Sequence, residues 1–294
     1  MRNLFYNDVL EAGFHENGFV KLPMLNNKEL ELLLSRLSNL KPDDNFWPKD
    51  RGSDYHCTFL DTNEDYKFKA NKLISEVFTP HINKILSGYS ILNGNFYIKQ
   101  PGGGRFEIHQ NWTFTPEVKY TTFTIWCPLV DVDTFNGTIE LVPGSHKITR
   151  DIACVNVDYY FKNFEDALVD HYLKPVDLKA GEAIIFDDSL IHYSSQNNSR
   201  HPRLAIQIET IPEEMTPVIY YFNKDKPDLG FEVFEVNFDF FIENNINTMK
   251  NRPSKLKSLG FIKNPNRPLD EEEFIRILND AGSIRSQLLN STWS

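Results

Sequence analysis

The stretch Arg203-Leu204-Ala205-Ile206-Gln207-Ile208-Glu209 alternates polar or small residues with branched apolar ones. Successive side chains of a strand point to opposite faces, so the branched residues share one face. Arg203, Ala205 and Gln207 then share the other face. The stretch predicts a β-strand that is apolar on one side and carries an arginine among small or polar neighbours on the other.

Similar short runs, separated by turn residues, fill the chain from about residue 91 to 211. Runs of this length and spacing are typical of a β-sandwich or a jelly roll. We therefore expect a mainly β fold with flanking helices. The predicted strands cover residues 95–99, 105–112, 121–130, 138–142, 182–186, 191–194 and 203–210.

The segments on either side of this core have different patterns. Residues 1–90 are predicted to be largely helical, with a helix capped by Asn26 and Glu29 and a second over 65–78. Residues 212–294 hold aromatic-rich segments at 218–222 and 231–241, then a helix capped by Asp270. We expect one domain over 1–294. The C-terminal extension is predicted to cover the mouth of a site or to pair subunits in a homodimer, and the sequence does not decide between these roles.

Bulk composition narrows the class of protein. The chain has 294 residues, a formal charge of −10 and a pI of about 5.3, which argue against nucleic acid as a partner. Neither a signal peptide nor an apolar run long enough for a membrane span is evident, so we expect a cytoplasmic protein with no membrane partner. The three cysteines are widely spaced and predict reduced thiols.

Two histidines have the spacing of metal ligands. A catalytic iron that must also bind a co-substrate and dioxygen needs three protein ligands on one face, usually two histidines and a carboxylate. His109 and residue 111 would point the same way along a strand, and His192 would come from another strand. Position 111, however, is asparagine.

Arg203 lies eleven residues after His192, at the start of the alternating strand. A guanidinium that faces the interior needs an anion, and the distal carboxylate of a dicarboxylic oxo-acid matches its fork of donors. Ser194 could add a hydroxyl to the same carboxylate.

Several ordered blocks of sequence resemble the phytanoyl-CoA dioxygenase family of Fe(II)/2-oxoglutarate oxygenases. The resemblance covers roughly residues 95 to 212 and is more specific than any single motif. The blocks are His109-Gln110-Asn111-Trp112, Thr124-Ile125-Trp126-Cys127-Pro128-Leu129-Val130-Asp131, Asn136-Gly137-Thr138, Leu141-Val142-Pro143-Gly144-Ser145-His146-Lys147, Leu178-Lys179-Ala180-Gly181-Glu182-Ala183, His192-Tyr193-Ser194 and Pro202-Arg203.

The resemblance implies a double-stranded β-helix, cupin-like, in which Fe(II) is held by His109, Asn111 and His192. It also implies that Arg203 and Ser194 hold 2-oxoglutarate, with Trp126, Gln110 and Lys99 beside the co-substrate or the substrate. The implied reaction uses O2 to hydroxylate a small-molecule metabolite or natural-product intermediate. Desaturation, ring formation and halogenation are alternative outcomes of the same chemistry.

Asn111 is the departure from the family, which has aspartate at this position. A carboxamide offers a carbonyl oxygen to a metal but no negative charge, so metal affinity and turnover should fall. Four explanations are open: an engineered isostere, a natural weak ligand, a substitute carboxylate such as Glu107, or loss of catalysis. A halogenase fits less well, because Asn still fills the volume that a halide would take.

Other readings of the motifs compete with this one. A catalytically inactive binding protein on the same scaffold is the main alternative, and a cupin-like metal isomerase would not need Arg203. His146 is a rival ligand for which the preceding Pro-Gly turn favours a structural role in a surface loop. Asp187-Asp188 is expected to shape a turn. Gly102-Gly103-Gly104 lacks the context of a phosphate loop, and no nucleophile elbow supports a hydrolase.

Overall fold

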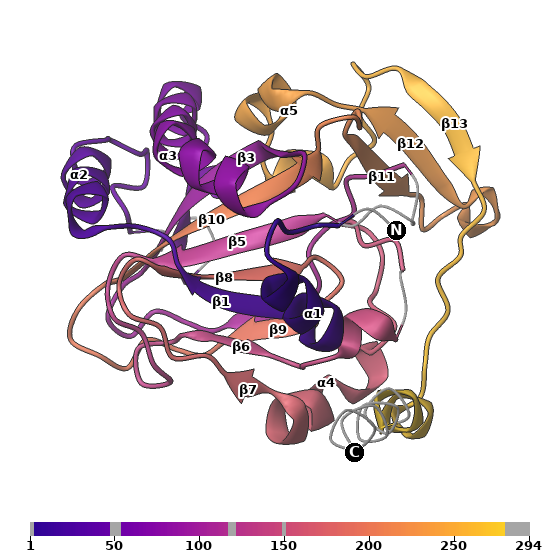
Figure 1. Cartoon of the computed structure of the whole chain (residues 1–294). Coiled ribbons are helices and arrows are strands. Elements are labelled where there is room, and N and C mark those ends of the chain that lie inside the picture. The colour runs from indigo at the N-terminus through magenta and orange to yellow at the C-terminus, as the bar shows by residue number, and fades with distance from the viewer. Residues whose placement is uncertain (1–2, 48–53, 117–121, 149–150, 280–294) are drawn as a thin grey trace.

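Two antiparallel sheets form the centre of the protein, and the computed structural model describes residues 3–47, 54–116, 122–148 and 151–279. Figure 1 shows the smaller sheet lying below the larger one. The larger sheet contains, in spatial order, β1 (Phe19–Pro23), β8 (Glu182–Asp187), β5 (Phe123–Pro128), β10 (Arg203–Pro212), β3 (Tyr89–Lys99) and β2 (His56–Cys57). The smaller contains β4 (Phe106–His109), β9 (His192–Ser194), β6 (Ile139–Leu141) and β7 (Lys174–Pro175). This arrangement confirms the predicted jelly roll.

Three helices cover the outer face of the larger sheet: α1 (Asp8–Asn17), α2 (Asn27–Ser38) and α3 (Glu64–Ile85). The predicted capping box is present, because the Asn26 side chain accepts from the Glu29 N–H and the Glu29 side chain accepts from the Asn26 N–H. α3 extends beyond the predicted 65–78 and contains Pro80.

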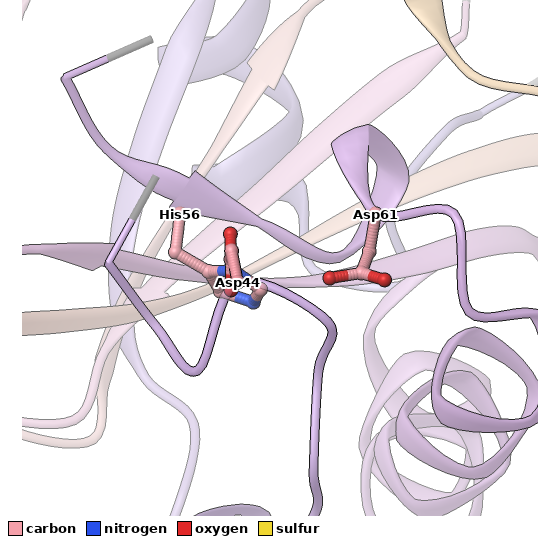
Figure 2. A group of neighbouring side chains, drawn as sticks. All are labelled: Asp44, His56 and Asp61. Atoms are coloured by element: carbon pink, nitrogen blue, oxygen red, sulfur yellow. The ribbon is translucent and has the colours of Figure 1, made fainter. Parts of the chain in front are cut away.

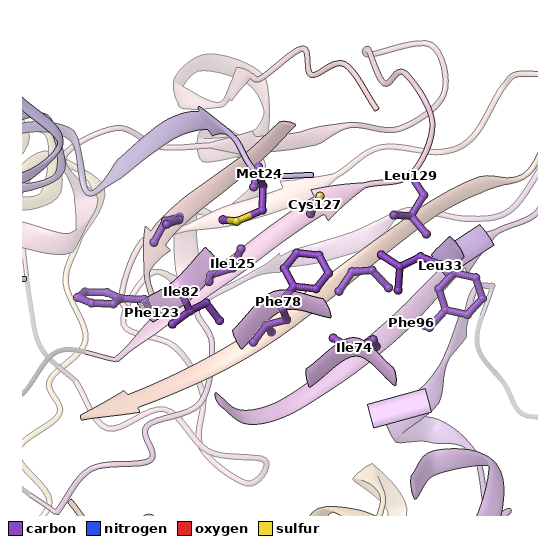
Figure 3. Close-up of a cluster of buried hydrophobic side chains, with 14 of the residues drawn as sticks. Met24, Leu33, Ile74, Phe78, Ile82, Phe96, Phe123, Ile125, Cys127 and Leu129 are labelled. Atoms are coloured by element: carbon purple, nitrogen blue, oxygen red, sulfur yellow. The ribbon is translucent and has the colours of Figure 1, made fainter. Parts of the chain in front are cut away.

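α3 packs closely on β3. A Cβ on Gly94 would lie 2.8 Å from Ile74 Cγ2, so this glycine permits the close approach. Figure 3 shows Ile74, Phe78 and Ile82 of the helix in one apolar cluster with β-strand residues such as Phe123. Burial of these side chains fixes the larger sheet as a rigid base for the opposite face.

The two faces of β10 behave as the alternation predicts. Leu204, Ile206 and Ile208 pack toward the helices, whereas Ala205 joins an apolar cluster between the two sheets. Arg203 and Gln207 line a small cavity in that inter-sheet space. The strand therefore delivers its polar side chains to the interior of the jelly roll.

Two local features differ from the sequence expectations. The run 105–112 is a strand only over Phe106–His109, with a register shift between these residues in the pairing of β4 with β9. Asn111 thus follows the strand instead of sharing its face with His109. The N-terminal part also contributes β1 and β2, whose pairing with strands distant in sequence leaves little local pattern.

A third sheet is formed by β11 (Val218–Phe222), β12 (Phe231–Glu235) and β13 (Ser258–Ile262), with α5 (Phe238–Glu243) and α6 (Ile246–Met249) nearby in sequence. The helix predicted after Asp270 is present over 271–279, and Asp270 Oδ1 accepts from the Glu273 N–H at 2.7 Å. Phe274 of this helix packs against Phe164, which precedes α4 (Glu165–Ala167). Among the described residues, none of the helices is long and apolar enough to cross a membrane.

Candidate metal centre and adjoining cavities

His109 and His192 face each other across the smaller sheet. They are register partners in the pairing of β4 with β9, and their ring centroids are 4.0 Å apart. His109 Nδ1 lies 2.7 Å from the Glu107 carbonyl, and His192 Nδ1 lies 2.8 Å from the Leu190 carbonyl. A carbonyl oxygen only accepts, so each Nδ1 carries the proton and each Nε2 keeps its lone pair.

This tautomer suits metal binding. Ligating histidines commonly donate their second ring N–H to a backbone carbonyl, which fixes the ring and the free nitrogen. Burial lowers the pKa of His109 to about 4, with the bond to Glu107 opposing the shift. Burial, followed by the neighbouring His109, holds the pKa of His192 well below its usual value. Both rings are therefore neutral at pH 7, as a metal ligand must be.

These depressed pKa values predict a pH dependence of stability. The folded pKa of His109, about 4, lies below its ordinary value of 6.5, so between these values the unfolded chain binds more protons. The contribution of neutral His109 to the free energy of unfolding is complete above about pH 6.5 and is lost as the pH falls toward about 4. Urea unfolding of the metal-free protein should show His109→Gln losing less stability than wild type over this window, by up to about 3 kcal/mol. Parallel pH profiles of the two proteins would contradict the prediction.

Asn111 lies beyond the end of β4 and is attached to the loop after β8. Its backbone N–H donates to the Asp188 carbonyl at 2.9 Å, and its Nδ2 donates to Thr124 Oγ1 at 2.6 Å. In the described part of the chain, its Oδ1 receives no hydrogen bond, so it remains available as a ligand oxygen.

Glu107 does not take the place of a carboxylate ligand in this structure. Its side chain is 72% exposed and pairs with Arg105 at 2.9 Å. Within the described ranges, no His, Cys, Asp or Glu side chain completes a three-ligand group with His109 and His192. The described residues therefore offer no support for the alternative of a substitute carboxylate, and Asn111 stays the third-ligand candidate.

Arg203 is buried and has no counterion among the residues that the structure describes. Its side chain is 3% exposed and, over residues that the structure describes, it forms no ion pair and donates no hydrogen bond. The guanidinium carbon lies 5.4 Å from the ring centre of Trp126. Burial lowers the pKa of Arg203 to about 10, which leaves it charged at pH 7. A buried, unpaired cation is costly, and this one therefore indicates a site for an anion.

A cavity of about 40 Å³ joins the arginine to the two histidines. Its wall includes His109, His192, Arg203, Trp126 and Ser194. The sequence-predicted residues from β4, β5, β9 and β10 are thus brought together around one small space, with metal-ligand atoms at one side and an anion anchor in the same wall.

Lys99 lies behind this cavity and does not line it. It is the register partner of Arg203, and its Nζ donates to Ser194 Oγ at 2.8 Å and to the carbonyls of Ser194 and Ser195 at 2.9 and 2.5 Å. Burial, and then the charge of Arg203, lower the pKa of Lys99 to about 6. Ser194 Oγ in turn donates to the Gly137 carbonyl at 2.9 Å. In this arrangement Lys99 positions Ser194.

A larger cavity of about 570 Å³ lies on the other side of His109. His109, Phe106, Tyr97 and Gln207 line both spaces. Asn111 and Gln110 line only the larger cavity. The Gln110 side chain donates to the Ser189 carbonyl. The volume suits a small organic molecule.

Sequence reasoning missed two buried acids near Asn111. Glu209 lines the larger cavity, and it continues the inward face of β10 that carries Arg203 and Gln207, so the alternation could have indicated it. Asp188 is buried and hydrogen-bonds Asn111 and Thr124. Only its neighbour Asp187 shapes the turn as expected, by accepting from Ser189, and no sequence signal separates the two.

Figure 2 shows a separate cluster of Asp44, His56 and Asp61, whose ligand atoms lie within 4.8 Å of one another. His56 Nδ1 is 2.8 Å from Asp44 Oδ2, and its Nε2 is 2.7 Å from the Tyr66 hydroxyl. Asp61 accepts from the backbone N–H groups of Asp43 and Asn63. Because these atoms already have protein partners, the cluster is explained as a structural network.

His146 also has a structural position. It lies in a 3-10 helix (Ser145–Lys147), and its Nε2 is 3.3 Å from the His15 carbonyl. The expected surface loop is wrong, because His146 is 7% exposed. The turn packs inward, since a Cβ on Gly18 would lie 2.4 Å from His146 Nδ1.

Comparisons with known proteins show which family the chain resembles. A family model described as phytanoyl-CoA dioxygenase (PhyH) matches residues 14–205. The phytanoyl-CoA dioxygenase domain-containing protein 1 homolog of Dictyostelium discoideum is 34% identical over 145 residues, 47% of this chain and 50% of that protein. Ectoine dioxygenase of Halomonas elongata is 29% identical over 224 residues, 65% of each chain. The match spans about half the length of the former and under two thirds of the latter.

A solved structure shares the fold over most of the chain. The epimerase SnoN, in complex with Fe3+, alpha ketoglutarate and nogalamycin RO, has a TM-score of 0.54 and 16% identity. The alignment covers 90% of this chain and 96% of that one. At 16% identity, this similarity shows a shared fold and nothing more.

Proposed function

The chain belongs to the phytanoyl-CoA dioxygenase family, and on that premise we propose that it is an Fe(II)/2-oxoglutarate-dependent oxygenase acting on a small organic molecule. The observation that carries the proposal is Arg203, a buried cation without a partner in the described structure. It lines the same small cavity as His109 and His192, whose Nε2 atoms are prepared for a metal.

His109, His192 and Asn111 Oδ1 would hold the iron. When bound, Fe(II) would supply the activation of O2 that couples decarboxylation of 2-oxoglutarate, giving succinate and CO2, to oxidation of the substrate. Arg203 would bind the distal carboxylate of 2-oxoglutarate, and Trp126 would pack over the guanidinium. Lys99 would hold Ser194 in the cavity wall. The protein's part is to place the two reactants and to keep bulk water away from them.

The larger cavity would receive the substrate. Tyr55, Phe106 and Trp112 give it apolar walls, while Gln110 and Asn111 add amide groups beside His109. The charged residues at its edge are paired, for example Arg105 with Glu107 and Lys162 with Glu165. No cluster of cations that would suit a CoA phosphate appears in its described lining. We therefore favour a small metabolite or natural-product intermediate, hydroxylated as the default outcome.

We also propose that residues 1–294 act as one unit in which the C-terminal extension covers the substrate cavity or pairs two subunits. Phe241 and Ile246 of this extension line the larger cavity, which supports the covering role. The protein would work in the cytoplasm on a small molecule, without nucleic acid or membrane partners.

The test is oxygen-dependent formation of succinate. Iron-loaded protein supplied with 2-oxoglutarate should release succinate slowly in air even without substrate, and anaerobic samples or samples with a chelator should release none. A metabolite library should then reveal substrates that accelerate this release. Binding of both iron and 2-oxoglutarate without any succinate would favour the inactive binding protein, and absence of binding would refute the proposal.

A further inference from the structure

Two buried polar side chains, Thr124 and Asp188, contact the side chain of Asn111, and Thr124 in turn contacts Glu209. Asn111 Nδ2 lies 2.6 Å from Thr124 Oγ1 and 3.4 Å from Asp188 Oδ1. Thr124 lies on β5, Asp188 follows β8, and Glu209 lies on β10. We call Thr124, Asp188 and Glu209 the acidic cluster.

Few donors serve the carboxyl oxygens of the acidic cluster, although Gln207 Nε2 donates to Glu209 Oε1 at 2.8 Å. Thr124 Oγ1 lies 2.7 Å from Asp188 Oδ1 and 3.0 Å from Glu209 Oε2, but a hydroxyl has one proton and can donate to only one of them. Asp188 Oδ2 is buried without a hydrogen-bond partner, and across the described residues neither carboxyl forms an ion pair. The amide of Asn111 therefore donates to a cluster in which one oxygen of Asp188 has no partner in the described structure.

An aspartate at position 111 would change the balance in two ways. It would remove both amide hydrogens and would place a third carboxyl group beside the other two. A buried acceptor that loses its donor is destabilising, and an added buried charge without a partner is more so. The surroundings therefore suit a carboxamide at position 111 better than a carboxylate.

The same contacts orient the carboxamide. Because Nδ2 faces the acidic cluster, Oδ1 is turned the other way, and Asn111 and His109 line one cavity. We infer that the acidic cluster selects asparagine at position 111 and presents its Oδ1 to the metal. The metal part of this inference rests on the proposed function, whereas the selection of asparagine does not.

A double-mutant cycle, measured by thermal unfolding of the metal-free protein, tests whether the acidic cluster selects asparagine at position 111. Asn111→Asp should lower Tm by roughly 6 to 12 °C, as expected for an unpaired buried charge in a chain of this size. Adding Asp188→Asn should restore most of that loss, because the double variant again has one amide and one carboxyl at these positions. The two changes should therefore not be additive.

Asn95→Asp is the matched control. Asn95 is 5% exposed and lines the larger cavity, but it makes no hydrogen bond to the acidic cluster in the described structure. Asp188→Asn should not rescue Asn95→Asp. An unchanged Tm for Asn111→Asp, or equal rescue of both aspartate variants, would overturn the selection of asparagine.

Co(II) binding, followed by its visible absorption under anaerobic conditions, tests the orientation of the Asn111 carboxamide. Thr124→Val removes the 2.6 Å partner of Asn111 Nδ2 and should weaken Co(II) binding by roughly ten-fold or more, the usual effect of removing an outer partner. Unchanged affinity in this variant would overturn the orienting role and leave the proposed iron site intact. If wild type binds no Co(II), the proposed iron site fails while the unfolding cycle still decides the selection of asparagine.

Discussion

Arg203→Met is expected to weaken 2-oxoglutarate binding by at least two orders of magnitude, about 3 kcal/mol, without destabilising the metal-free protein. The affinity for 2-oxoglutarate falls because Arg203 is the only cationic side chain among the described residues that line the small cavity. Stability should be preserved because this buried cation has no partner to lose in the described structure. Methionine also removes an uncompensated charge while keeping most of the volume. Anaerobic calorimetric titration and urea unfolding measure the two effects.

Arg105→Met is the matched control for this experiment. Arg105 lies at the edge of the larger cavity, 62% exposed and paired with Glu107, so its loss should leave 2-oxoglutarate affinity within about two-fold, as is usual for a surface pair. Normal affinity in Arg203→Met would show that the anion binds elsewhere. A large drop in stability would show that the guanidinium has an unrecognised structural role.

His192→Ala is the second change with a large expected effect, a loss of metal binding of at least 100-fold. One of two imidazole ligands would be removed, and the ring of His109 alone would not hold Fe(II) against water. Co(II) absorption, with stability measured on the metal-free protein, separates loss of a ligand from loss of the fold.

His56→Gln distinguishes the two groups of histidines. His56 belongs to the cluster of Asp44, His56 and Asp61, and its ring nitrogens contact Asp44 and Tyr66 (Figure 2). We expect this variant to lose stability but to keep metal affinity. The reverse pattern, in which His56→Gln loses metal and His192→Ala keeps it, would move the metal site to that cluster.

Much of the fold could be predicted from the sequence, because these elements depend on local periodicity. The alternation after Arg203 indicates which side chains of β10 point inward, and Asn26 with Glu29 indicates the start of α2. The meeting of His109, His192 and Arg203 was expected from the family blocks, and the structure brings these residues to one cavity. Their assignment as iron and co-substrate ligands stays a prediction.

What could not be predicted depends on contacts between distant segments. β4 ends at His109, so Asn111 lies beyond the strand, and a register shift interrupts the pairing of β4 with β9. In the sequence, Asp188 has the pattern of a turn residue. Only the folded structure places it, in the loop after β8, against Asn111 and Thr124. Lys99 is inward like Arg203, yet its three hydrogen bonds draw it behind Ser194.

The central claim is that one site joins the histidine pair to an anion anchored by Arg203. Anaerobic titration of the Fe(II)-loaded protein with 2-oxoglutarate tests it most directly, because chelation of iron by the oxo-acid produces a visible charge-transfer band. The account predicts a saturable band at one equivalent of 2-oxoglutarate that is absent from His192→Ala and shifted to much higher concentrations in Arg203→Met. A band that persists unchanged in both variants, or no band in the iron-loaded wild type, would contradict it.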